Sequence, residues 1–166
     1  MLVTEFIEQL NKINEAGANS AKEKFIADRI KRKYVPVAEK AAKVNEAIKY
    51  SIISSKEEGM YIDYIVEEVN FVYLAIISYT DITAPLDSDN IPSPTEMYDI
   101  LKSSGADEDI LSRIGKDLLE FRYINEQAIE MWEKRNGGLR GIIKDFSQAF
   151  SMITPLLSES DEGAKQ

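Results

Sequence analysis

The fold is decided by residues 60–80, which read MYIDYIVEEVNFVYLAIISYT. The first half of this stretch alternates apolar and charged residues, whereas residues 71–77 are apolar without interruption. A segment that is apolar on every face has to be surrounded by other segments. Its Tyr, Ile and Val residues also favour strands. However, the stretch exceeds an ordinary strand in length, and no other segment offers a convincing strand partner. We therefore predict a central buried helix at about 60–80, although the sequence leaves open whether residues 71–79 form a strand that pairs between subunits.

The rest of the chain divides into amphipathic segments that can surround this helix. Apolar residues recur at helical spacing, and residues typical of helix starts and stops separate the segments. Helix starts are marked by Thr4, by Asn19 or Ser20, by Pro36 and by Ser93 with Pro94. The predicted helices cover about residues 4–16, 20–33, 36–55, 94–104, 107–135 and 139–153. Gly115 is a candidate break within the 107–135 helix, because Gly is unfavourable inside helices.

These segments predict an all-α fold, a single-domain bundle of six or seven helices around the 60–80 helix. A chain of 166 residues is long enough to bury a hydrophobic core in one domain. We expect the domain to span residues 1–157 and residues 158–166 to form a disordered polar tail. Residues 81–92, which are rich in Pro, Asp, Ser and Asn, are expected to be a flexible connector.

The composition restricts the chemistry that the chain can perform. It contains neither Cys nor His. Their absence excludes disulfides, cysteine-ligated metals and nucleophilic sites of the Ser-His or Cys-His type. We therefore expect a protein that is not an enzyme and uses no cofactor.

No targeting or membrane-spanning segment stands out. Acidic residues follow almost directly after Met1, and the apolar run at 71–77 is much shorter than the ~20 residues of a spanning helix. We expect no membrane contact and a location in the cytoplasm of a host cell or in a virion.

Charge is distributed unevenly along the chain, whose net charge is −9. Residues 19–50 hold nine Lys and Arg against four acidic residues, whereas residues 51–100 hold one Lys against ten acidic residues. The basic residues concentrate in the predicted second helix, where a cationic face could meet an acidic partner or a phosphate backbone. The candidate partner-binding residues are Lys22, Lys24, Arg29, Lys31, Arg32 and Lys33. The alternative is a solvated face, neutralised in part by the acidic residues 57–99.

Two further groups of residues are candidate sites. Asp63 and Glu67 share a helix face and could hold a hard cation such as magnesium, but an exposed or paired acidic edge is the favoured interpretation. The acidic residues Glu68, Glu120, Glu126, Glu130 and Glu133 are interpreted in the same way. The aromatic residues fall within helical apolar stripes and are expected in the core rather than in a base-stacking platform: Tyr61, Tyr64, Phe71, Tyr73, Tyr79, Tyr98, Phe121, Tyr123 and Trp132.

Residues 25–52, which begin FIADRIKRKYVPVAEK, and residues 77–83, ISYTDIT, carry a resemblance. They resemble small, acidic, mostly uncharacterised helical proteins encoded by tailed phages of Gram-positive bacteria. The resemblance spans about the first half of the chain and contains no catalytic motif. It implies a non-enzymatic virion or assembly component and transfers no site residues.

Three functions therefore remain open. The first is an interaction or structural protein, a phage virion or assembly component that binds a protein partner or itself. The second is an acidic inhibitor of a host nucleic-acid-binding or defence enzyme, in which residues 57–99 imitate phosphates. The third is nucleic-acid contact through the basic residues 22–33, which the low pI of about 4.7 disfavours.

Overall fold

The computed structural model describes residues 1–55 and 59–136, and within these ranges the chain is mostly helical. The labelled helices are α1 (Val3–Glu15), α2 (Asn19–Ala27), α3 (Val37–Ser51), α4 (Tyr64–Tyr79), α5 (Pro94–Ser104) and α6 (Ala106–Ile114). A further helix covers residues 116–136. The strands β1 (Ile52–Ser55) and β2 (Gly59–Ile62) form a two-stranded antiparallel sheet. The predicted all-α, single-domain fold is confirmed, with this small hairpin as an addition.

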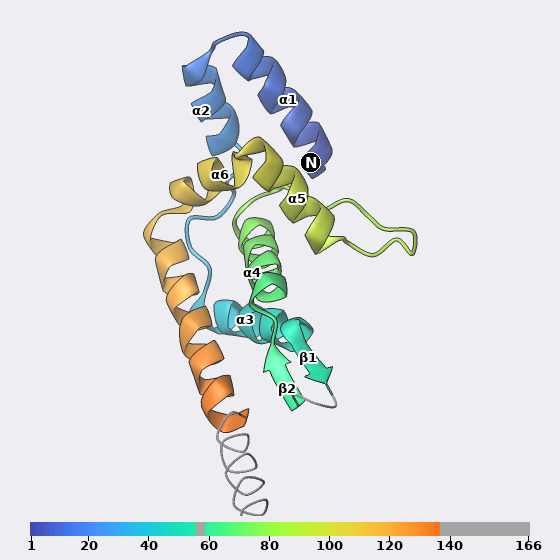
Figure 1. Ribbon diagram of the computed structural model, residues 1–166. Coiled ribbons are helices and arrows are strands. Elements are labelled where there is room, and N and C mark those ends of the chain that lie inside the picture. The colour runs from blue at the N-terminus through green and yellow to red at the C-terminus, as the bar shows by residue number, and fades with distance from the viewer. Residues whose placement is uncertain (56–58, 137–166) are drawn as a thin grey trace, which may run out of the picture.

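Helix α4 is the central element of the fold. It contacts α3, α5 and α6, and the 116–136 helix runs beside it in Figure 1. Its own side chains are buried along most of its length, including those of Phe71, Val72, Ala75, Ile76 and Tyr79. Burying one large apolar side chain contributes about 1.5–3 kcal/mol. The continuous apolar run therefore forms a core helix, which decides against the strand alternative for residues 71–79.

The beginning of the central segment differs from the prediction, because residues 59–62 are a strand and α4 starts only at Tyr64. The partner strand β1 was predicted as the end of the third helix. Ile52 pairs with Ile62 and Ile53 with Tyr61, so residue types that favour strands face each other. Asp63 then starts α4, because its carboxylate accepts hydrogen bonds from the N–H groups of the first helical turn.

The second helix is shorter than predicted. It ends at Ala27, and residues 28–35 are irregular, so the basic stretch is not one continuous helix. The N–H groups of Lys31 and Arg32 both donate to the carbonyl oxygen of Tyr79, at 2.8 and 3.1 Å. Ile30 forms an antiparallel bridge with Thr80. If α2 continued through residues 28–33, their backbone groups would bond within the helix, and these hydrogen bonds to the end of α4 could not form.

The predicted caps are confirmed for α5 and wrong for α1 and α2. Ser93 caps α5, which ends at Gly105 in the left-handed conformation. Leu2 and Ala18 occupy the N-cap positions of α1 and α2, in place of Thr4 and of Asn19 or Ser20. The chain before α1 pairs with residue Thr83, whose N–H donates to the Met1 carbonyl oxygen at 2.9 Å. This tertiary pairing sets where α1 begins.

A buried ionic network joins α3, α4 and the 116–136 helix. Lys40 of α3 is fully buried and donates to Asp117 Oδ1 at 2.7 Å and to Glu120 Oε2 at 2.6 Å. The hydroxyl of Tyr79 and the N–H of Val35 donate to Asp117 Oδ2, at 2.6 and 2.9 Å. Gly115 breaks the predicted 107–135 helix immediately before this network.

Three expectations lie outside the described residues. They are the last helix at 139–153, the polar tail at 158–166 and the part of the predicted single domain between residues 154 and 157.

Candidate interaction groove

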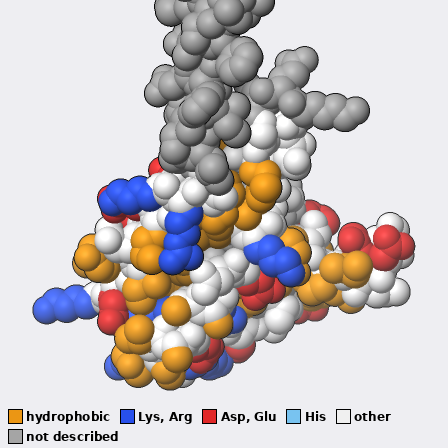
Figure 2. Space-filling view, turned by 90° about the horizontal axis from the view of Figure 1, so that it is seen from below, with side chains coloured by type: hydrophobic (Ala, Val, Ile, Leu, Met, Phe, Trp, Pro, Cys, Tyr) orange, Lys and Arg blue, Asp and Glu red, His pale blue; other side chains and the backbone are white. Residues whose placement is uncertain are grey.

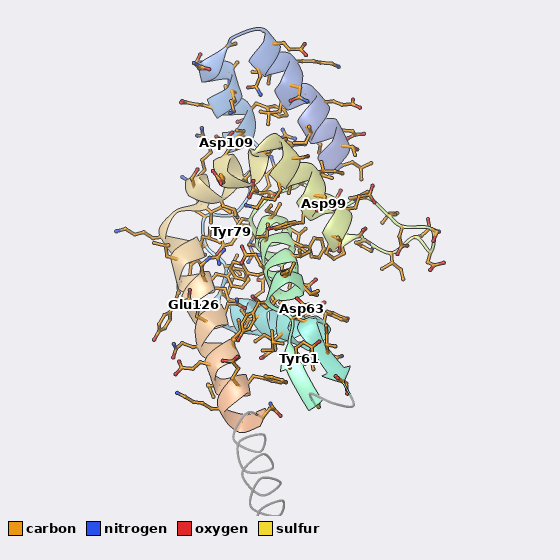
Figure 3. The ribbon with its side chains drawn as sticks, in the orientation of Figure 1. Tyr61, Asp63, Tyr79, Asp99, Asp109 and Glu126 are labelled. Atoms are coloured by element: carbon orange, nitrogen blue, oxygen red, sulfur yellow. The ribbon has the colours of Figure 1, made fainter. Side chains whose placement is uncertain are left out.

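The predicted partner-binding cations lie in two places rather than on one helix face. Lys22 and Lys24 are on α2, while Arg29, Lys31 and their neighbours are on the irregular stretch that follows it. Most of them are paired within the chain. Lys22 contacts Asp109 at 2.6 Å, which links α2 to α6 (Figure 3).

Three of the remaining cations also have acidic partners. Arg29 and Lys31 each contact Asp81 Oδ2 at 3.4 Å, and Arg32 forms a bidentate pair with Glu39 at 2.8 Å. The ammonium groups of Lys24 and Lys33 form no ion pair with a residue of the described chain. Four of the six candidates therefore support the fold, as the interpretation of a partly neutralised face anticipates.

The carboxylates considered as a cation site do not form one. Asp63 Oδ1 accepts from the N–H groups of Ile65 and Val66, at 2.9 and 3.1 Å. Glu67 points into the core and accepts from Asn125 at 2.7 Å. Burial raises the pKa of Glu67, and the hydrogen bond from Asn125 opposes this change only in part. Within residues 1–55 and 59–136, no group of three or more His, Cys, Asp or Glu residues is arranged to hold a metal ion.

The other acidic residues of this group have structural partners as well. Glu68 contacts Arg122, Glu120 contacts Lys40 and Glu130 contacts Lys134. Glu133 accepts a hydrogen bond from the Tyr64 hydroxyl. Glu126, labelled in Figure 3, lies exposed on the 116–136 helix.

The aromatic residues are divided between core and surface. Phe71, Tyr79 and Phe121 are buried and pack together, with 5.2 Å between the ring centroids of Phe71 and Phe121. Tyr64 and Tyr123 are exposed. The remaining members of the set are partly buried, and all but Tyr61 pack against the core: Tyr61, Tyr73, Tyr98 and Trp132. The prediction of a common core location is therefore correct for only part of the set.

An apolar groove of about 500 Å³ lies beside α3 and α4. Residues from both helices, from the end of the 81–93 loop and from the start of α5 form its walls. They are Glu46, Ala47, Tyr50, Val66, Asn70, Tyr73, Leu74, Ile91, Pro92, Pro94 and Thr95. We call this set the α3–α4 groove.

Local structure fixes the position of the groove walls. Asp87 Oδ1 accepts from the N–H groups of Asp89 and Ile91, at 2.8 and 2.9 Å, and closes the tip of the 81–93 loop. This turn sets Ile91 against the groove. Asn70 Nδ2 donates to Ser51 Oγ at 3.2 Å, which ties α4 to the end of α3. The groove is therefore formed by segments that are held in place independently of any ligand.

The groove is apolar and slightly acidic. Glu46 is the carboxylate among the residues that line it, and burial together with the nearby Glu46 carboxylate raises the pKa of Tyr73. Tyr50 and Ile91 remain 65% and 58% exposed. Apolar side chains that stay exposed around a concavity are typical of a site where another molecule binds.

Further hydrophobic side chains are exposed on and next to the β1–β2 hairpin, which lies in the lower part of Figure 1. Ile53 and Met60 of the hairpin and Ile65 of α4 are among them. Figure 2 views the molecule from this side and shows hydrophobic side chains interspersed with both basic and acidic ones. Sequence reasoning missed the groove. Tyr50 follows the apolar positions of the third helix in sequence, but nothing local indicates that it borders the 81–93 loop.

No protein-family model, no curated protein and no solved structure matches this chain. Among the described residues, no helix has both the length and the apolar character needed to cross a membrane. The functional interpretation therefore depends on the groove and on the distribution of charge.

Proposed function

We propose that this chain is a non-enzymatic interaction protein that binds an apolar segment of a protein partner in the α3–α4 groove. The biological setting, a virion or assembly component of a tailed phage, is proposed from the sequence resemblance alone. The observation that carries the binding proposal is that Tyr50 of α3 and Ile91 of the 81–93 loop both line the groove and remain exposed.

The chemistry of the groove indicates what kind of segment it accepts. Amphipathic helices bind apolar grooves through side chains spaced three or four residues apart. Glu46 is the charged side chain among the groove residues, and no Lys or Arg belongs to that set. A complementary partner segment therefore presents apolar residues together with Lys or Arg, because opposite charges favour the correct orientation.

The two alternative functions have less support. Four of the six basic candidates pair with acids of the same chain, which leaves few free cations for a phosphate backbone. In the acidic segment, Glu67 is buried, while Glu68 and Asp81 pair with cations. A surface that imitates phosphates requires a row of free carboxylates, and these three do not contribute to it.

Affinity capture with matched variants tests the proposal. The tagged chain is expressed in the host bacterium, and the proteins that co-purify are quantified by mass spectrometry for the wild type, Tyr50→Ser and Tyr123→Ser. Tyr123 is the matched control, because it is 61% exposed and lies on the 116–136 helix outside the groove. Light scattering over a range of protein concentrations checks whether the partner is a second copy.

We expect at least one protein, or the chain itself as an oligomer, to associate with the wild type and with Tyr123→Ser. Truncating one central aromatic residue of an interface costs ~2 kcal/mol or more, so Tyr50→Ser should reduce the association by at least about 30-fold. The proposal is overturned if Tyr50→Ser retains the association while circular dichroism shows an intact fold. It is also overturned if the wild type captures nothing and remains monomeric.

A further inference from the structure

The segment that leads into α3 presents apolar side chains to solvent. Tyr34 and Val37 are 58% and 49% exposed, and Pro36 is exposed as well. Pro36 has φ −56° and ψ 142°, values of the polyproline II conformation. Lys33 is exposed and forms no ion pair with a residue of the described chain. We call Lys33, Tyr34, Pro36 and Val37 the 33–37 segment.

The backbone of the 33–37 segment is held by the rest of the protein. Val35 is fully buried, and its N–H donates to Asp117 Oδ2 at 2.9 Å. Just before the segment, the N–H of Arg32 donates to the Tyr79 carbonyl oxygen at 3.1 Å. The exposed side chains are therefore presented on a fixed backbone, which reduces the entropy that is lost when they bind a partner.

The α3–α4 groove has the side chains that bind such a segment. Tyr50 and Tyr73 line it, together with Pro92 and Pro94. Grooves lined by aromatic residues bind extended segments that contain proline, because the polyproline II conformation is already ordered before binding. The 33–37 segment also combines apolar residues with a lysine, which is the composition expected above for the partner. Its backbone conformation and its composition therefore both fit the groove.

Unpaired charges favour the same contact. Glu46 lines the groove, Glu96 directly follows two lining residues in sequence, and Asp87 closes the loop that forms one wall. None of these three carboxylates forms an ion pair with a residue of the described chain. Lys49 is the neighbouring cation in sequence, and its ammonium group lies 5.8 Å from the ring centroid of the next residue. The three carboxylates outnumber this lysine, so the groove attracts a segment that carries a free cation.

We propose that the partner bound in the α3–α4 groove is a second copy of this chain, which docks there through its 33–37 segment. This inference rests on the proposed function, because it names the occupant of the same groove. The segment lies at the start of α3 and Tyr50 near its end, so residues 37 and 50 are about 20 Å apart along the helix. In Figure 1 the chain enters α3 beside the 116–136 helix and leaves it at the hairpin. A chain therefore does not fill its own groove.

The contact joins two different surfaces, so each copy both supplies a segment and receives one. Such heterologous contacts form rings where the rotation between copies closes, and open filaments where it does not. We therefore expect assemblies of more than two copies at high protein concentration. Added salt should weaken them, because the contact includes opposite charges near the surface.

Complementation between two variants tests the proposal in the full-length chain. Sedimentation velocity over a range of protein concentrations compares the wild type with Tyr34→Ser, Tyr50→Ser and Tyr123→Ser. Tyr123 is the matched control, because it is 61% exposed and belongs neither to the groove nor to the 33–37 segment. We expect the control to associate as the wild type does, and each of the other two variants to associate at least about 30-fold more weakly.

An equimolar mixture of the two weakened variants retains one intact contact. The segment of the Tyr50→Ser chain is unchanged, and so is the groove of the Tyr34→Ser chain. The mixture should therefore form heterodimers and nothing larger. This recovery is specific to a contact between two different surfaces, and it also shows that both variants are folded.

A mixture that remains monomeric while circular dichroism shows two folded variants overturns the inference, as does self-association that Tyr34→Ser leaves unchanged. A wild type that stays monomeric but captures another protein through Tyr50 also overturns it, and leaves the proposed function standing. Self-association that Tyr50→Ser leaves unchanged contradicts both.

Discussion

Lys40 Nζ lies 2.7 Å from Asp117 Oδ1, and the Lys40 side chain has no exposure to solvent. Burial opposes the charge on Lys40, but the hydrogen bonds to Asp117 and Glu120 outweigh it and raise the pKa of the lysine. The same network lowers the pKa of Asp117 against the effect of burial, through hydrogen bonds from Lys40, Tyr79 and the Val35 N–H. A charged pair thus connects α3 to the 116–136 helix inside the protein.

Removing the ammonium group of Lys40 should lower the free energy of unfolding substantially. Lys40→Met leaves Asp117 buried without its counter-charge, and breaking a buried pair in this way typically costs about 3–5 kcal/mol. We expect a loss near the lower end, about 3 kcal/mol, because Glu120 is partly exposed and the Tyr79 and Val35 hydrogen bonds to Asp117 remain. Urea unfolding of the two proteins at neutral pH measures the difference.

Lys134→Met serves as the control for this prediction. Lys134 pairs with Glu130 at 2.5 Å on an exposed helix face, and such i,i+4 pairs contribute only about 0.3–0.5 kcal/mol. If the two lysine variants lose equal stability, the Lys40 network does not hold the helices together.

A second prediction concerns Glu67, whose carboxylate is buried beside Asn125. Asn125 Oδ1 is also buried and has no hydrogen-bond partner within the described chain. Glu67→Gln removes the buried charge and supplies an N–H donor for this oxygen. We expect the variant to be more stable than the wild type by about 1–2 kcal/mol at pH 7, since an unsatisfied buried polar group costs about 1–3 kcal/mol.

The sign of the pH dependence follows from the raised pKa of Glu67. An acid whose pKa is raised by folding stabilises the protein below its unfolded pKa, and this stability is lost as pH rises through the folded pKa. The advantage of Glu67→Gln should therefore be largest at neutral pH and disappear near about pH 4, where Glu67 of the wild type is protonated. Urea titrations at the two pH values measure it. If Glu67→Gln is more stable than the wild type by the same amount at both pH values, ionisation of Glu67 is not the cause.

The apolar pattern of the sequence predicted the central helix correctly, because the stretch is longer than an ordinary strand and no other segment offered a convincing strand partner. The pattern failed at Ile52 and Ile53. Ile52 fits the apolar face of a longer third helix that also contains Ile53, and only their pairing with Ile62 and Tyr61 makes them a strand. A local rule cannot detect a partner that lies across a turn.

The candidate site was less predictable than the fold. Lys40 was one of many lysines in a basic region, and its burial depends on Asp117, which belongs to a distant helix. Arg29 and Arg32 were candidates for partner contact, yet pair with Asp81 and Glu39. The groove depends on the loop that brings Ile91 to the end of α3. Each of these features is a tertiary relationship between segments that the sequence describes only separately.

A third prediction addresses the start of α4. Asp63 is its N-cap, and Asp63→Ala removes the acceptor for the N–H groups of Ile65 and Val66. Loss of such a cap typically costs ~1 kcal/mol. Asp63→Asn keeps an acceptor oxygen and should recover most of this loss in the same unfolding experiment. If Asp63→Asn is as unstable as Asp63→Ala, the charge rather than the cap is responsible.

The cap also gives a prediction for magnesium. Asp63 is occupied by backbone N–H groups, and Glu67 is turned into the core, so the two carboxylates do not face a common ion. We expect magnesium chloride to raise the melting temperature no more than sodium chloride of equal ionic strength does. A specific rise that Asp63→Asn abolishes would instead establish a cation site at this helix start.

The last prediction compares two glycines that end helices. Gly105 has φ 69° and ψ 10°, the left-handed conformation that Asn also adopts, whereas Gly115 has φ 72° and ψ −136°. The second combination is accessible almost only to Gly. A Cβ at either position would meet no described atom within 4 Å, so a substitution changes backbone strain without a steric clash.

We therefore expect Gly115→Ala to lose about 2–3 kcal/mol and Gly105→Ala about 1 kcal/mol. Gly105→Asn should lose less than Gly105→Ala, while Gly115→Asn should remain as destabilising as Gly115→Ala. The break at Gly115 also sets the direction in which the 116–136 helix brings Asp117 to Lys40. Combining Gly115→Ala with Lys40→Met should accordingly cost less than the sum of the two single changes. If the losses of unfolding free energy measured in urea are strictly additive, the break at Gly115 and the Lys40 network stabilise the protein independently of each other.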